Sequence, residues 1–290
     1  MRTYDGTWDT PGSIFSRNTG IVPDRIREAH VVIVGCGSVG SFAAVELARA
    51  GVSHFMLIDT DKFGVQNLSR HELTIEWDGL PKVDGLAEKI VATNPTSKVI
   101  AIEEVAEFVD PALFDRFLVG KSGLIIGAAD NRQACAWAGR VARMTGSHFV
   151  AIGLWERAAA GEIFIQPKNS GPCYECALGR LIGGVQQGRF DNYTTDEGVN
   201  LDFIPGLNVD IIDVAVKGVK VAIDLLCQGP GYEPRILGSL QNYVLVCNSD
   251  NVAHGGQQVE IFSYPGQIAK VKIEFGAGCP PCKWGRDGVQ

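Results

Sequence analysis

Three glycines and a downstream acid are the first residues whose spacing suggests chemistry. The stretch "GCGSVG" places Gly35, Gly37 and Gly40 in a G-x-G-x-x-G pattern, and Asp59 follows at the distance typical of a ribose-binding acid. Glycine lets the backbone approach a phosphate closely, and the start of a helix favours negative charge. The pattern fits ATP, NAD or FAD about equally. A tight strand-to-helix turn without a ligand is the plain alternative.

Two Cys-x-x-Cys pairs are the second such group, with Cys173 and Cys176 in "CYEC" and Cys279 and Cys282 in "CPPC". In a reducing compartment, such pairs indicate metal or redox chemistry rather than structural disulfides. Two pairs complete a tetrahedral zinc site, and four sulfur ligands leave no open position for a substrate. We therefore predict a structural Zn²⁺ site, with two redox-active dithiols as the alternative.

The stretch "DTDKFGVQNLSRH", residues 59–71, carries more polar groups than a dinucleotide needs. Asp61, Asn67, Arg70 and His71 lie in this stretch, and Lys82 follows shortly after it. Arginine and lysine in such places are usually solvated surface charges. Their number here nevertheless raises the question of which ligand would use them.

Asp130 stands where the fourth strand is expected to end, at the carboxyl edge where ligands gather in open α/β sheets. A carboxylate there suits Mg²⁺ beside a nucleotide's phosphates. An N-cap for the helix that follows is the alternative, and spacing alone does not separate the two.

Buried strands and amphipathic helices alternate along the chain and must position these residues. Continuous apolar runs predict strands at 30–35, 54–59, 97–105, 123–130, 148–155 and 161–167. Helical spacing predicts helices at 38–51, 82–94, 110–118, 131–146 and 209–229. This alternation predicts an α/β fold, a Rossmann-like doubly wound and mostly parallel sheet.

We expect a single domain, residues 1–290, in four parts. Residues 1–29 are an N-terminal helical segment and residues 30–182 the nucleotide-binding core. Residues 183–206 are polar, Gly-rich and aperiodic, which is typical of a mobile crossover loop. Residues 207–290 are predicted to hold a helix, a C-terminal antiparallel extension between 236 and 275, and the second cysteine pair.

The composition excludes some classes of function. The 290 residues include 46% hydrophobic and 20% charged residues, as in an ordinary globular protein, and the net charge is −7. An acidic chain without a basic run is unsuited to coating nucleic acid. No apolar run approaches the length needed to cross a bilayer, and the first residues lack a secretory signal. We therefore expect a cytoplasmic protein that does not bind membranes.

The motifs "GCGSVG", "ELARAGV", "IDTDKFGVQNLSRH", "GLPK" and "AADN" occur in an order and spacing that resemble the ubiquitin-activating-enzyme-like family (ThiF/MoeB/HesA). "GPCYECAL" and "CPPCKWG" are similar to its zinc cysteines. The resemblance runs from about residue 14 to residue 285. It implies ATP-dependent adenylation of a C-terminal carboxylate, usually that of a ubiquitin-like or sulfur-carrier protein ending in Gly-Gly.

The resemblance also implies roles for individual residues. Asp59 would hold the ATP ribose, Asp61 would help to position the metal or phosphates, and Asp130 would bind Mg²⁺. Asn67, Arg70 and Lys82 would neutralise the triphosphate. Arg17, in "FSRNTG", resembles an arginine that homodimers of this family insert into the partner's active site.

The sequence departs from the family pattern in two places. Many relatives carry a thioester-forming cysteine in the long loop, where this chain has Thr194 and Thr195. The other cysteines are expected to be small buried hydrophobes: Cys36, Cys135, Cys227 and Cys247. This favours an enzyme that stops at the acyl-adenylate. His71 replaces the usual glutamine, and it can still donate a hydrogen bond.

Other functions stay open. A carboxylate on a peptide or on a modified tRNA base is an alternative substrate, although the acidic pI counts against tRNA. An NAD- or FAD-dependent oxidoreductase would leave Asn67, Arg70, Asp130 and the cysteine pairs unexplained. A non-catalytic scaffold would have no need of the phosphate-binding groups.

Overall fold

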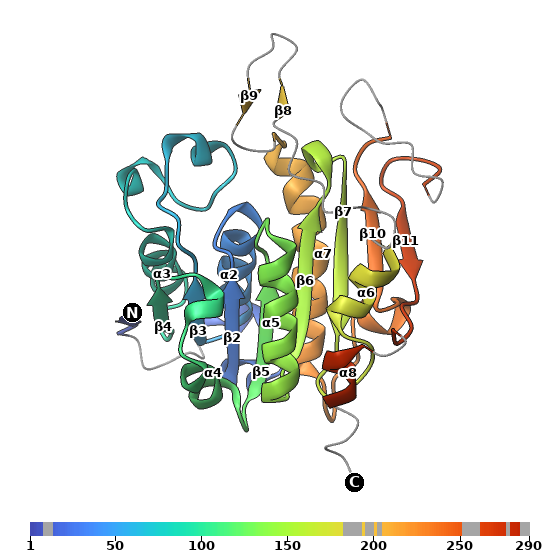
Figure 1. Cartoon of the computed structure of the whole chain (residues 1–290). Helices are drawn as coiled ribbons and strands as arrows, with labels where there is room; N and C mark the ends of the chain where they lie inside the picture. The colour runs from blue at the N-terminus through green and yellow to red at the C-terminus, as the bar shows by residue number, and fades with distance from the viewer. Residues whose placement is uncertain are drawn as a thin grey trace.

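One large sheet organises the molecule (Figure 1). The computed structural model describes residues 1–7, 14–181, 193–194, 200–201, 205–250, 262–276 and 279–284. Within these ranges nine strands follow the order β1-β4-β3-β2-β5-β6-β7-β10-β11. Their bounds are β1 Arg2–Asp5, β2 Ala29–Val34, β3 His54–Ile58, β4 Lys98–Ile102, β5 Ser122–Gly127, β6 His148–Leu154, β7 Ala160–Gln166, β10 Tyr243–Cys247 and β11 Ile268–Val271. A separate antiparallel pair is formed by β8 (Tyr193–Thr194) and β9 (Asn200–Leu201).

Helices cover both faces of the sheet. They are α2 (Ser38–Ala50), α3 (Lys82–Thr93), α4 (Pro111–Leu118), α5 (Arg132–Thr145), α6 (Tyr174–Leu181), α7 (Asn208–Cys227) and α8 (Pro280–Trp284). Short 3-10 helices span Ser16–Asn18, Asp24–Glu28, Val65–Ser69, Ile75–Trp77, Ala106–Phe108, Glu156–Ala158 and Leu237–Ser239. In Figure 1, α4, α5 and α6 lie in front of the sheet, and α2 and α7 lie behind it. None of the described helices combines the length and apolar character that a membrane span requires.

The centre of the sheet is parallel and its flanks are antiparallel. Strands β4, β3, β2, β5 and β6 run parallel, whereas β1, β7, β10 and β11 pair with antiparallel neighbours. The predicted parallel core and C-terminal antiparallel extension are therefore confirmed. The extension begins at β7, because the few residues between β6 and β7 are too short for a parallel crossover.

The central strand β2 shows why this sequence is buried on both sides. Val31 and Ile33 belong to the apolar cluster that contains α2 and α7, while Val32 and Val34 belong to the cluster on the α4 and α5 side. Successive side chains in a strand point to opposite faces, so a continuous apolar run fits a doubly covered strand. The strand order reverses between β2 and β5, and ligands bind outside the carboxyl ends of strands at such a point.

Two sequence expectations need correction. Residues 2–5 form an edge strand rather than part of a helical segment, because they pair with β4 and Tyr4 donates a 2.8 Å hydrogen bond to Asp84. The helical turn expected before the first strand is present as a 3-10 helix at Asp24–Glu28. The fourth predicted strand ends at Gly127, so Asp130 lies in the loop between β5 and α5.

The predicted crossover loop, residues 183–206, lies mostly outside the described residues. The described part of this segment includes the antiparallel pair of β8 and β9. In Figure 1 this pair lies at the same end of the sheet as the segment between β3 and α3, whereas α8 lies at the opposite end.

Candidate functional site

The glycine turn between β2 and α2 separates two kinds of glycine. Gly35 has φ +90°, and a Cβ there would lie 2.5 Å from the backbone nitrogen of Ala129. A Cβ on Gly40 would lie 1.9 Å from the carbonyl oxygen of Gly35. A Cβ on Gly37 would meet no described atom within 4 Å. The first and third glycines are thus required by the fold, while the second leaves an open approach to the start of α2, where backbone N–H groups favour an anion.

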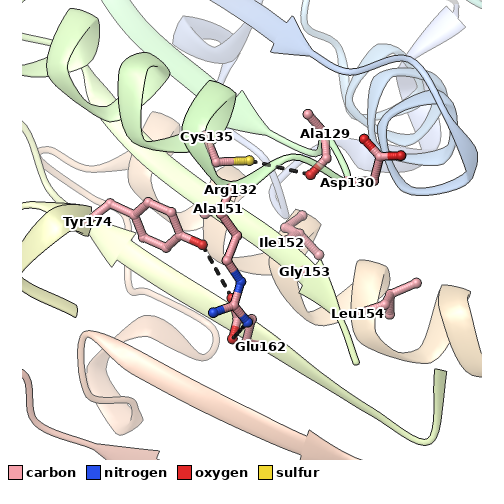
Figure 2. Close-up of a pocket in the computed structure, with 10 residues that line it drawn as sticks. All are labelled: Ala129, Asp130, Arg132, Cys135, Ala151, Ile152, Gly153, Leu154, Glu162 and Tyr174. Carbon is pink, nitrogen blue, oxygen red and sulfur yellow. Dashed lines mark hydrogen bonds and ion pairs between the residues drawn. The ribbon is translucent and has the colours of Figure 1, made fainter. Parts of the chain in front are cut away.

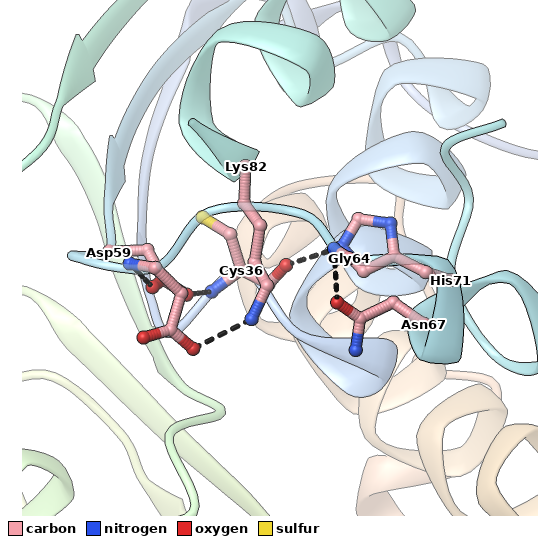
Figure 3. A network of polar contacts seen from close by, with 7 residues as sticks. Cys36, Asp59, Gly64, Asn67, His71 and Lys82 are labelled. Atoms are coloured by element: carbon pink, nitrogen blue, oxygen red, sulfur yellow. Dashed lines mark hydrogen bonds and ion pairs between the residues drawn. The ribbon is translucent and has the colours of Figure 1, made fainter. Parts of the chain in front are cut away.

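Two side chains fix the backbone of this turn (Figure 3). Asp59 accepts hydrogen bonds from the Cys36 nitrogen at 2.6 Å and from the Asp61 nitrogen at 2.8 Å. Burial raises the pKa of Asp59, and these backbone donors act in the opposite direction. His71 Nδ1 accepts from the Leu73 nitrogen, so Nε2 carries the proton and donates to the Cys36 carbonyl at 2.7 Å. Burial lowers the pKa of His71 to about 4, so the ring is neutral at pH 7.

The segment between β3 and α3 brings a lysine to the same edge. Lys82, the first residue of α3, places Nζ 2.7 Å from Asp61 Oδ2. The lysine side chain is 9% exposed and the aspartate 63%, so the lysine is buried beside the turn and its ammonium group pairs with an exposed carboxylate. Asn67 lies inside the 3-10 helix Val65–Ser69, and its Oδ1 accepts from the Gly64 nitrogen at 3.0 Å and so caps the start of that helix. The local role of Asn67 is therefore structural.

Asp130 is not the helix cap that the sequence left open. Asn131 is the N-cap of α5, and its side chain accepts from the Gln133 nitrogen at 2.8 Å. The carboxylate of Asp130 is exposed at the switch point of the sheet. Burial lowers the pKa of Arg70, whereas the negative charge of Asp130 raises it. The two side chains are therefore close enough for their charges to interact.

Arg17 is the predicted site residue that the structure does not bring to the others. It lies in the 3-10 helix Ser16–Asn18, and the neighbouring Asn18 donates to the Arg49 carbonyl at 3.0 Å. Arg49 is in the last turn of α2, whereas the glycine turn precedes the first. Thirteen residues of helix separate the two ends by about 20 Å. Arg17 therefore cannot reach the site of its own chain.

The two cysteine pairs come together as predicted. Cys173, Cys176, Cys279 and Cys282 place their sulfur atoms within 4.8 Å of one another. Individual distances are 3.7 Å from Cys173 to Cys176, and 3.4 Å both from Cys173 to Cys279 and from Cys176 to Cys282. Sulfur ligands at about 2.3 Å from a tetrahedral Zn²⁺ would lie about 3.8 Å apart, so this donor set fits the ion.

The other four cysteines are buried, as predicted: Cys36, Cys135, Cys227 and Cys247. Burial raises the pKa of each thiol, to about 12 for Cys135 and about 11 for Cys227. A thiol with a raised pKa is a poor nucleophile at neutral pH. The structure thus gives none of these four the surroundings of an activated cysteine.

Sequence reasoning missed a polar cluster next to Asp130 (Figure 2). Glu162, on β7, is buried and accepts from Trp155 Nε1 at 3.0 Å, Tyr174 Oη at 3.3 Å and Tyr243 Oη at 2.5 Å. Arg132 lies 3.6 Å from the same carboxylate. The signal in the sequence was a charged residue inside the apolar run "GEIFIQP", since buried acids are rare unless they are paired.

Comparisons with known proteins agree with this geometry. The chain is 33% identical over 165 residues to ubiquitin-like modifier-activating enzyme 5 of Drosophila willistoni, covering 53% of this chain and 40% of that protein. The enzyme of the same name from Aedes aegypti is 32% identical over 171 residues, which cover 54% and 42%. The matched part thus spans about two fifths of these curated relatives.

Solved structures share the fold. E. coli MccB with ATP superposes with a TM-score of 0.63 at 19% identity, covering 89% of this chain and 68% of that one. MccB with MccA gives 0.66 at 19% identity, covering 95% and 75%. The model of the ThiF family matches residues 17–245, which include the glycine turn, Asp59, Lys82, Asp130 and the first cysteine pair. The chain therefore belongs to the ThiF family.

Proposed function

We propose that this protein adenylates the C-terminal carboxylate of a ubiquitin-like or sulfur-carrier protein ending in Gly-Gly, with ATP as the donor and pyrophosphate as a product. The observation that carries the proposal is the open approach at Gly37, beside the exposed carboxylate of Asp130. A dinucleotide-dependent oxidoreductase would use the glycine turn and Asp59 but not the polar segment that follows. Membership of the family and relatives called modifier-activating enzymes support the same class of reaction.

The nucleotide would lie across the carboxyl ends of β2 and β5. The start of α2 would receive phosphate oxygens through its backbone N–H groups. Asp59 would accept from the ribose hydroxyls while it keeps the turn in place. Lys82 and Arg70 would face the triphosphate, and Asn67 would support the loop that carries Arg70. Asp61 would hold Lys82 in position when no nucleotide is bound.

Asp130 would hold Mg²⁺, which would supply positive charge beside the phosphates. Asp130 suits this ion because Mg²⁺ prefers carboxylate oxygens as ligands. Its carboxylate is exposed and is not used as the cap of α5. When bound, the ion neutralises charge on the leaving pyrophosphate.

The reaction joins two anions. One oxygen of the substrate carboxylate attacks the α-phosphorus, and the bond from that phosphorus to the bridging oxygen of pyrophosphate breaks. The carboxylate is already ionised at neutral pH, so no general base is required. Catalysis is then a matter of positioning and of cations that lower the repulsion. The protein supplies Lys82 and Arg70 for the second purpose.

The four clustered cysteines would hold Zn²⁺ as a structural ion. Four thiolates close its coordination sphere and leave no place for a substrate. In Figure 1, α8 lies at the opposite end of the sheet from β8 and β9, which supports a role outside the reaction. The raised pKa values of the four remaining thiols support an enzyme that releases an acyl-adenylate without forming its own thioester.

We also propose a homodimer in which Arg17 completes the site of the neighbouring protomer. The support is geometric, because Arg17 is exposed and lies at the end of α2 remote from its own glycine turn. A cation from the partner would add to Lys82 and Arg70 at the point where the two anions meet.

ATP–pyrophosphate exchange tests the proposed function. The assay would use a panel of small β-grasp proteins ending in Gly-Gly, with Asp130→Asn as the site variant and Asp115→Asn, an exposed aspartate on α4, as the matched control. We expect exchange that depends on the Gly-Gly tail, is lost in Asp130→Asn and is kept in Asp115→Asn. Absence of exchange with ATP still bound would favour a peptide or a modified tRNA base. Binding of NAD instead of ATP would contradict the proposal.

A further inference from the structure

A cavity on the far side of Asp130 from the glycine turn has polar walls that the nucleotide does not use. Its volume is about 60 Å³, and it is partly open to solvent. Its lining includes Asp130, Arg132, Gly153, Glu162 and Tyr174. Figure 2 shows the guanidinium of Arg132 pointing towards Glu162, whereas the carboxylate of Asp130 points away from it. The cavity therefore begins at the proposed metal ligand and leads away from the phosphates.

Glu162 fixes the far wall of this cavity. Its side chain is 5% exposed, and Trp155, Tyr174 and Tyr243 donate to its two oxygens from three different segments of the chain. A buried carboxylate with several donors has one orientation, because any rotation would leave a buried donor unsatisfied. The carboxylate is thus held in one place and attracts the guanidinium group of Arg132 to it.

Arg132 is the cation on this side of Asp130. It is the first residue of α5, two residues after Asp130, and its side chain is 49% exposed. Its terminal nitrogen lies 3.6 Å from Glu162, an ion pair that is too long for a normal hydrogen bond. The five N–H donors of the guanidinium are therefore oriented by the charge of Glu162 but remain able to bind a ligand.

Gly153 forms the neighbouring wall, where a side chain of its own would crowd Glu162. A Cβ on Gly153 would lie 3.0 Å from Glu162 Cγ and 3.2 Å from Oε1. Gly153 and Glu162 are direct partners in the antiparallel pairing of β6 with β7. Gly153 thus keeps a side chain away from the Glu162 carboxylate.

We infer that Arg132, oriented by Glu162, binds the terminal carboxylate of the substrate's tail through the oxygen that does not attack the α-phosphorus. That oxygen becomes the carbonyl oxygen of the acyl-adenylate, so the same contact serves before and after the reaction. The inference rests on the proposed function. It makes Arg132 a substrate-binding residue and Glu162 a positioning residue.

The test is the affinity for 5′-O-[N-(glycylglycyl)sulfamoyl]adenosine, in which a sulfamoyl group replaces the phosphate of the acyl-adenylate, measured by calorimetry beside AMP and ATP. The variants are Arg132→Gln and Arg132→Lys. The matched control is Arg140→Gln, since Arg140 lies on the same helix, is 52% exposed and also pairs with a glutamate, Glu175. A thermal melt of each variant shows that it is folded.

We expect Arg132→Gln to weaken binding of the sulfamoyl compound roughly 10- to 100-fold, the loss of a charged hydrogen bond, and to change AMP and ATP affinity less than twofold. The affinity of Arg132→Lys for this compound should lie between those of the wild type and Arg132→Gln, because lysine keeps the charge but lacks the planar guanidinium group. Arg140→Gln should change nothing. Tyr243→Phe removes one donor to Glu162. It should weaken binding of the sulfamoyl compound by less than Arg132→Gln does, and it should leave the affinity for AMP and ATP unchanged.

The outcomes separate this inference from the proposed function. If the wild-type protein binds the sulfamoyl compound no better than AMP, both fail. If it binds the compound more tightly than AMP but Arg132→Gln binds it equally well, only the role of Arg132 is overturned. An increase in affinity on removing Arg132 would also overturn it, because the ligand of the cavity would then be cationic.

Discussion

The two sides of Asp130 are built in different ways. On the nucleotide side, the glycine turn, Asp59, His71 and Lys82 come from one stretch of about fifty residues, and local hydrogen bonds hold them. On the cavity side, the Glu162 cluster draws on β7, α5, α6, β10 and the loop after β6, so long-range pairing of strands assembles it. The comparison shows that neighbouring residues in the sequence build the first side, whereas the tertiary structure builds the second.

The largest expected effect concerns the cation on the nucleotide side. We expect Lys82→Ala to lower the rate of ATP–pyrophosphate exchange roughly 10²- to 10³-fold, because one preorganised charge at the reacting phosphates is lost. Stability should also fall, because alanine removes a lysine side chain that is only 9% exposed, although its partner Asp61 is 63% exposed and stays solvated.

Lys62→Ala is the control, because Lys62 is exposed in the same segment. Equal rates for the two variants would show that Lys82 does not face the triphosphate, and the nucleotide side would have to be redrawn.

Gly40 and Gly37 are expected to have different roles within the glycine turn, the first in stability and the second in ATP binding. Gly40→Ala should lower the free energy of unfolding by about 3 kcal/mol, because its Cβ would lie 1.9 Å from the Gly35 carbonyl oxygen and the backbone must shift. Gly37→Ala should cost about 1 kcal/mol, because Gly37 is the N-cap of α2, where alanine is less favourable than glycine, while its Cβ meets no described atom. It should weaken ATP binding about tenfold. Urea unfolding and calorimetry with ATP measure the two quantities. A Gly37→Ala variant with wild-type ATP affinity would contradict the open approach.

The cysteine cluster tests whether stability and nucleotide binding are separate. We expect removal of Zn²⁺ with a chelator to lower the melting temperature by at least about 5 °C, because an ion held by the four cysteines would join the turn before α6 to α8. ATP affinity of the protein that remains folded should change less than twofold. The zinc content of the purified protein, measured by mass spectrometry, is the accompanying control. Unchanged melting after complete removal would argue against a structural ion.

The smallest effect is on stability in mild acid. Burial lowers the pKa of His148 to about 4, below the usual value near 6.5 in the unfolded chain. A histidine held neutral contributes stability that is present above pH 6.5 and is lost as the pH falls from 6.5 towards 4, because the unfolded state then binds the extra proton. We expect His148 to account for about 1 kcal/mol of the loss between pH 7 and pH 5.5, measured by urea unfolding. Burial also lowers the pKa of His30, His54 and His71, so these residues add to the total loss. His148→Gln should have a shallower dependence, and an identical slope would exclude His148 as its source.

The parts of the molecule that local sequence determines could be predicted from the sequence, whereas the parts that long-range contacts assemble could not. The elements from β2 to α5 were predicted in kind and order, because continuous apolar runs, Gly51 and Gly146 mark them locally. Two of the strands, β4 and β5, end three residues earlier than predicted. Strand β1 was missed because only two of its four residues favour strands, and its pairing with β4 decides its structure. Arg132 and Glu162 were missed as a pair because their contact depends on the register of β6 with β7 and on a tyrosine from β10.

One measurement tests the central claim that a carboxylate meets the α-phosphate at Asp130. A carrier protein ending in Gly-Gly would be prepared with ¹⁸O in its terminal carboxylate, treated with ATP and the enzyme, and the adenylate cleaved with hydroxylamine. Hydroxylamine attacks the carbonyl carbon, so the bridging oxygen leaves with AMP. The account predicts AMP that is heavier by one ¹⁸O atom, in an amount matching the hydroxamate formed. AMP of natural mass would contradict it, because no bond would then have formed between the carboxylate oxygen and phosphorus.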